Sequence, residues 1–156
     1  MKGTRLLFFA SWIILLVVAA AIALLSLQSL RIAYTGNQDN LITGFTLDQI
    51  REYGGEAAVK AFKGRRATAA TWALAYAMLA LPVILWPYRR GERWAWWALL
   101  VSLGVSQLLS ILRVPMLGTT LGSGAPGILL AFTLLGLLAG APHFFSRRDA
   151  AIDEVI

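Results

Sequence analysis

The sequence predicts an all-α fold: a four-transmembrane-helix bundle with one or two short amphipathic interfacial helices in the first loop. Three observations support this prediction. Uncharged apolar stretches fill more than half of the 156 residues, every carboxylate lies outside them, and only 14% of the residues are charged. Each stretch is long enough for a helix to cross about 30 Å of hydrocarbon at about 1.5 Å per residue. The four stretches are Leu6–Leu30, Ala67–Tyr88, Trp94–Leu112 and Gly127–Phe145.

The chain is expected to form a single integral membrane domain over residues 1–156. The polar residues suffice for short loops, one longer loop and a tail, but not for a separate soluble domain. The expected spans cover about 6–30, 67–88, 94–114 and 126–145. The long loop is then 31–66, and the tail is 146–156.

The first span follows Lys2 and Arg5, as the apolar core of a secretory signal peptide would. Its apolar run, Leu6–Leu30, is much longer than the roughly 7–15 residues of a signal-peptide core. We therefore expect an uncleaved signal anchor that forms the first membrane span.

The long loop 31–66 carries a helix-start signal. Thr46 and Gln49 have the spacing of a capping box, and apolar residues follow at helical spacing until Gly54-Gly55. A second short helix is expected over Glu56–Phe62. Both segments are amphipathic, which favours helices lying at the level of the lipid head groups. The alternative is a mobile loop.

The second half of the chain is punctuated by proline, glycine and arginine. Pro82 predicts a kink near the end of the second span, and Arg89–Arg93 predicts a tight, charged hairpin. Pro115 ends the third span and a glycine-rich connection follows. Pro126 then suits the first turn of the last helix.

Basic residues cluster at the ends of the spans and give a net charge of +6. In such positions they contact anionic head groups and set topology, so the charge does not predict nucleic-acid binding. Lys2, Arg5 and the basic hairpin favour both termini on the cytoplasmic side. Aromatic residues gather at that same face and predict an interfacial belt. They are Phe8, Phe9, Trp12, Trp86, Tyr88, Trp94, Trp96, Trp97, Phe144 and Phe145.

Small residues recur every four positions and predict faces for helix packing. The third span carries Ser102, Ser106 and Ser110, in a row that leads to Arg113. The fourth carries Gly136 and Gly140 in a GxxxG motif. The serine row is interpreted as a packing seam, because hydroxyls without a carboxylate relay protons poorly. A polar track towards Arg113 is the alternative. The same small-residue faces are also suited to docking partner subunits.

Arg113 lies near the end of the third span, where burial in lipid is costly. Three interpretations stay open. The guanidinium snorkels to the interface, or it pairs with an acidic residue of the long loop: Asp39, Asp48, Glu52 or Glu56. In the third, it binds a lipid phosphate or another anion. The turn Gly122-Ser123-Gly124, before the N-terminus of the last helix, would then offer backbone amides to the same anion.

Catalytic residues are scarce in this sequence. There is no cysteine and only one histidine, His143, so thiolate metal sites and a bis-histidine haem are excluded. No Ser–His–Asp or HExxH pattern occurs, and no carboxylate lies within a span. We therefore expect no catalytic, cofactor-binding or metal residues. Small four-helix sterol-isomerase-type enzymes share this size, but they need intramembrane acids and histidines.

The hairpin Arg89–Trp97, read together with the hydropathy pattern, resembles small bacterial four-helix inner-membrane proteins to which no activity is assigned. The resemblance implies a four-helix fold in a bacterial inner membrane and carries no activity.

The expected function is that of a non-enzymatic accessory or assembly subunit of a membrane complex. Its expected partners are membrane lipids and other membrane subunits or further copies of the chain, not nucleic acid. The alternative is a binding protein for a lipid or a small hydrophobic or anionic ligand, centred on Arg113. A small membrane enzyme or transporter comes third.

Overall fold

The computed structural model describes residues 2–35, 46–117 and 124–145, and all its elements are helical. Helix α1 is Lys2–Thr35, and α2 is Leu47–Val83, which ends in a π-helical turn, η1, at Ile84–Tyr88. After a tight hairpin the chain continues as α3 (Arg93–Leu99), a second π-helical segment η2 (Leu100–Val105) and α4 (Ser106–Leu117). Helix α5 is Gly124–Phe145.

Four helical stretches in the described residues are long and apolar enough to cross a membrane: Arg5–Thr35, Leu47–Tyr88, Arg93–Met116 and Gly124–Phe145. All four expected spans therefore coincide with helices. The helix that contains the second expected span is longer than that span, because it begins at Leu47 rather than near residue 67.

A kink at Gly55 divides α2 into two parts, as the pair Gly54-Gly55 predicts. Gly55 has φ 69° and ψ −175°, a conformation open almost only to glycine. Residues 56–83 then continue as one helix, so the expected separate helix over Glu56–Phe62 is wrong. At about 1.5 Å per residue, the 11 residues 56–66 extend α2 by about 16 Å beyond its apolar part.

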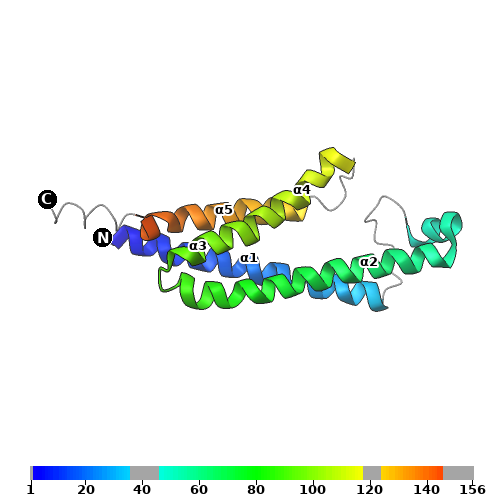
Figure 1. Cartoon of the computed structure of the whole chain (residues 1–156), viewed down its shortest axis with the longest axis horizontal. Helices are drawn as coiled ribbons and strands as arrows, with labels where there is room; N and C mark the ends of the chain where they lie inside the picture. Colours follow the sequence, from blue (N-terminus) through cyan, green and yellow to red (C-terminus); the bar gives the residue numbers. More distant parts are fainter. Residues whose placement is uncertain (1, 36–45, 118–123, 146–156) are drawn as a thin grey trace.

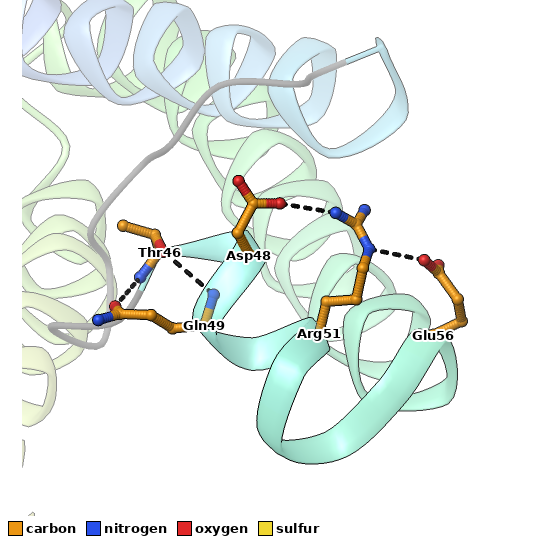
Figure 2. A network of polar contacts seen from close by, with 5 residues as sticks. All are labelled: Thr46, Asp48, Gln49, Arg51 and Glu56. Atoms are coloured by element: carbon orange, nitrogen blue, oxygen red, sulfur yellow. Dashed lines mark hydrogen bonds and ion pairs between the residues drawn. The ribbon is translucent and has the colours of Figure 1, made fainter.

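The segment before the kink, Leu47–Gly54, forms a short hook at the end of α2 (Figures 1 and 2). The predicted capping box is present: Gln49 N–H donates to Thr46 Oγ1 at 3.1 Å, and Thr46 N–H donates to Gln49 Oε1 at 2.8 Å. Arg51 bonds Asp48 at 2.7 Å and, across the kink, Glu56 at 2.6 Å. Of these bonds, only the one between Arg51 and Glu56 joins the hook to the rest of α2.

The hairpin between η1 and α3 closes one end of the molecule. Gly91, at φ 75°, allows the turn, and its N–H donates to the Tyr88 carbonyl at 2.9 Å. Pro87 has no backbone N–H to donate to a helical hydrogen bond. The indole N–H of Trp12 donates to the Ile84 carbonyl at 3.1 Å. Arg93 donates to the Phe144 carbonyl at the end of α5 at 2.8 Å. The hairpin is thus tied to both α1 and α5.

Helix α1 is the centre of the packing and contacts both α2 and α5, while α4 packs against α5. The aromatic residues gather at the hairpin end, but they do not all face outwards. Tyr88, Trp96 and Phe144 are buried, so part of the expected belt is core. The buried apolar residues are Leu15, Val18, Ala19, Ile22, Ala77, Ala80, Ile84, Tyr88, Ala95, Trp96, Leu99, Leu103, Leu137 and Phe144.

Gly136 and Gly140 lie where α5 crosses α1. A Cβ at Gly136 would lie 3.0 Å from Leu15 Cγ. One at Gly140 would lie 2.6 Å from Ser11 Oγ and would overlap Tyr88 Oη. Ser11 and Tyr88 are fully buried and hydrogen-bonded to each other. The GxxxG face is therefore filled by α1 and η1.

The helices are closest at the hairpin end and separate towards the other end, where α4 diverges from the α1–α2 pair (Figure 1). At the hairpin end, small residues and packed aromatic rings allow the helices to approach one another closely. Arginines and hydroxyl-bearing side chains occupy the other end. The wedge between the α1–α2 pair and the α4–α5 pair is lined by arginines and hydroxyl-bearing side chains.

Candidate functional site: a cavity between two helix pairs

A cavity of about 1040 Å³ fills the wedge. This volume is at the upper end of the range of about 300–1,000 Å³ seen for small-molecule pockets. Its walls come from the second half of α1, the middle of α2, most of α4 and the first two turns of α5. The lining residues are Ile22, Leu25, Ser26, Ser29, Phe62, Arg65, Arg66, Ala69, Ala70, Trp72, Ala73, Tyr76, Ser106, Gln107, Ser110, Arg113, Ala125, Pro126 and Leu129.

Three arginines, Arg65, Arg66 and Arg113, give the cavity a positive end. Arg65 and Arg66 come from α2, and Arg113 comes from α4 on the opposite wall. Arg66 Nε donates to Ser29 Oγ of α1 at 3.2 Å, which fixes one guanidinium at the cavity edge. No carboxylate occurs among the described residues that line the cavity. The site is therefore suited to an anion.

Deeper in the cavity, a hydroxyl of α2 is hydrogen-bonded to a hydroxyl of α4. Ser106 Oγ lies 2.9 Å from Tyr76 Oη and also donates to the Leu103 carbonyl at 3.3 Å. Either hydroxyl can donate in the bond between Tyr76 and Ser106. Ser110 Oγ in turn donates to the Ser106 carbonyl at 2.9 Å. The bond between Tyr76 and Ser106 joins α2 to α4 on the hairpin side of the arginines.

The remaining walls are apolar, and part of their rim is open. Leu25 and Trp72 line the cavity but are 47% and 73% exposed on the outer surfaces of α1 and α2. In a membrane that outer surface faces hydrocarbon. The cavity therefore combines a cationic end with an apolar side opening, the two features that an amphiphile requires.

The predicted site residues divide between this cavity and the rest of the fold. Arg113, Ser106 and Ser110 line the cavity, while Ser102 lies within η2. Gly122 and Ser123 lie outside the described residues. Gly124 is the first residue of α5, directly before Ala125 and Pro126 of the cavity wall.

Two of the four acidic residues considered as partners of Arg113 bind a different arginine. Asp48 and Glu56 bind Arg51 in the hook, and Asp39 lies outside the described residues. His143 stacks on Phe8 with ring centroids 4.0 Å apart at the hairpin end. No group of three potential metal ligands occurs among residues 2–35, 46–117 and 124–145.

Sequence reasoning missed Arg65, Arg66, Ser26 and Ser29 as members of the site. The two arginines were interpreted as flanking charges, and their meeting with α1 depends on how two helices pack. A signal was available for the serines. Ser26 and Ser29 are three residues apart near the end of an otherwise apolar span, which marks a polar face.

Comparisons of the chain with protein-family models, with curated proteins and with solved structures found no match. The assignment of function therefore depends on the residues of the cavity.

Proposed function

We propose that the protein binds an anionic amphiphile, such as a membrane lipid, in the cavity between the α1–α2 and α4–α5 pairs. The observation that carries the proposal is the set of three arginines at one end of an apolar cavity whose described lining residues include no carboxylate. An anion binds the guanidiniums through charge-assisted hydrogen bonds. Its hydrocarbon part replaces the missing contacts between the diverging helices.

The level of the arginines along the bundle supports a lipid ligand. From Arg66 to Tyr88 is 22 residues of helix, or about 33 Å at about 1.5 Å per residue. This matches the thickness of the hydrocarbon core of a bilayer. With the aromatic hairpin end at one interface, Arg65 and Arg66 reach the head groups of the other. We further propose a bacterial inner membrane, with both termini cytoplasmic and the cavity at the outer leaflet.

A role as an accessory or assembly subunit is a second proposal, favoured by the hook. Leu47–Gly54 extends past the bundle, and its Tyr53 side chain is 80% exposed. A partner would have to use this hook or a lipid-facing surface, because Gly136 and Gly140 already pack against α1 and η1. Ligand binding is the better-supported function, because the cavity is a formed site.

Native mass spectrometry of protein purified in mild detergent tests the proposal. Arg66→Gln and Arg113→Gln should each lower retained anionic lipid about 10- to 100-fold, the effect of a charge-assisted hydrogen bond. Arg90→Gln is the matched control, because Arg90 is a basic residue at the hairpin end, 4.7 Å over the ring of Trp86. Equal lipid content in all three variants and the wild type would contradict the proposal. Co-purified protein chains without lipid would favour the accessory role.

A further inference from the structure

Two polar side chains that line the cavity make no hydrogen bond to another described residue. Four polar side chains are more than nine-tenths buried among the described residues: Ser11, Ser26, Gln107 and Thr133. Ser11 bonds Tyr88, and Thr133 donates to the Leu129 carbonyl at 2.8 Å. Ser26, 5% exposed, and Gln107, 7% exposed, make no side-chain hydrogen bond to another described residue, and their polar atoms are not among the fully buried unpaired ones, so they remain accessible from the cavity. Both line the cavity.

Unpaired polar groups are costly at such a position. Buried hydroxyls and amides in folded proteins nearly always have a partner, and a membrane interior offers little water to supply one. Apolar residues at both positions would remove this cost. Ser26 on α1 and Gln107 on α4 therefore fit a ligand that brings its own hydrogen-bonding groups into the cavity.

Helix geometry places Ser26 and Gln107 below the arginines, that is, closer to the hairpin end of the bundle than the arginines are. Gln107 precedes Arg113 by six residues of α4, or about 9 Å. Ser26 precedes Ser29, the partner of Arg66, by three residues of α1, or about 4.5 Å. The hydrogen-bonding part of the ligand thus lies one to two helical turns below its anion, on the way to the hydrocarbon.

We propose that the ligand is an anionic glycerolipid, an inference that depends on the proposed function. Its phosphate binds Arg65, Arg66 and Arg113, and its ester carbonyls accept hydrogen bonds from Ser26 Oγ and Gln107 Nε2. Its acyl chains leave along Leu25 and Trp72. A glycerophospholipid carries these groups in that order: phosphate, then esters, then chains. A fatty acid or an alkyl phosphate has no carbonyl below its anion.

Binding of two matched probes to the full-length protein in detergent tests this inference. The probes are dioleoyl phosphatidic acid and its diether analogue, which has the same phosphate and chains without the ester carbonyls. The wild type should bind the diester about three- to tenfold more tightly for each hydrogen bond made. Gln107→Leu and Ser26→Ala should each lower affinity for the diester and leave the diether unchanged.

Controls separate this inference from the proposed function. Thr68→Ala should keep the diester preference, because Thr68 does not line the cavity and its hydroxyl already donates to the Gly64 carbonyl at 3.0 Å. Arg66→Gln should weaken both probes equally. If the wild type binds both probes with equal affinity, the ester inference fails and the anion site stands. If it binds neither, the proposed function fails as well.

The stability of Gln107→Leu gives a second readout. Removing an unpartnered buried amide should leave the melting temperature of the ligand-free protein unchanged or raise it. A lower melting temperature would mean that Gln107 has a structural partner, and would overturn its assignment to the ligand.

Discussion

Gly140→Ala should destabilise the fold by about 1–5 kcal/mol. The new methyl group would overlap Tyr88 Oη and lie 2.6 Å from Ser11 Oγ, so it would separate a fully buried hydrogen-bonded pair. Overpacking costs about 1–3 kcal/mol, and leaving a buried polar group unpaired costs about 1–3 kcal/mol more. The gain in helix propensity from glycine to alanine returns only about 0.5–1 kcal/mol.

The assay is reversible unfolding in mixed micelles, followed by the fluorescence of the six tryptophans. Gly127→Ala is the matched control on the same helix, because a Cβ there meets nothing within 4 Å. It should be neutral or slightly stabilising. Gly136→Ala should fall between the two, because its Cβ would lie 3.0 Å from Leu15 Cγ.

A second substitution tests the cause of the effect. Tyr88→Phe removes the oxygen that the new methyl group would meet, so the double variant Gly140→Ala/Tyr88→Phe should lose less stability than the two single effects added together. If Gly140→Ala unfolds like Gly127→Ala, or if the two substitutions are additive, the packing of α5 against η1 and α1 is not as described.

Two further predictions concern topology and the hairpin end. The chain has no cysteine, so single cysteines at Tyr53 and Glu92 can be labelled with an impermeant reagent, and they should react from opposite sides of the membrane; labelling of both from one side would contradict four spans. Trp96→Phe should cost about 1–3 kcal/mol of unfolding free energy in the same micelle assay, because the buried indole donates to the Leu137 carbonyl at 2.9 Å and fills core volume. Trp97→Phe, at a 53% exposed position, should cost little, and equal losses at both positions would refute this account.

The sequence was sufficient to predict what depends on neighbouring residues. The spans follow from local hydropathy, the cap at Thr46 from a four-residue pattern, and the break at Gly55 from backbone freedom. The length of α2 was not predicted, because charges at Lys60–Arg66 end the apolar stretch without ending the helix. A helix is defined by its backbone hydrogen bonds, so it can extend beyond the apolar stretch that spans the membrane.

The candidate site was predicted only in part, for a related reason. Arg113 was recognised because a charge near an apolar span is unusual on its own. Arg66 and Ser29 are 37 positions apart, and only the packing of α2 on α1 brings them to one cavity. The π-helical segment η2, which precedes Ser106, changes the helical register of the serine row. Ser102 therefore falls outside the cavity lining, although the regular four-residue spacing of the serines in the sequence does not indicate this.

The two ends of the bundle have different roles: the hairpin end stabilises the fold, and the other end carries the proposed binding site. At the hairpin end, polar groups are paired within the fold, as in Ser11 with Tyr88 and Trp96 with Leu137. At the other end, three arginines line the cavity, and closing the wedge would bring their guanidiniums closer together and bury more polar surface. Substitutions at Gly140 and Arg66 are therefore expected to be independent: the first lowers unfolding free energy without changing probe affinity, and the second does the reverse. Strong coupling between these two positions would mean that the ligand holds the whole bundle together, rather than only its open end.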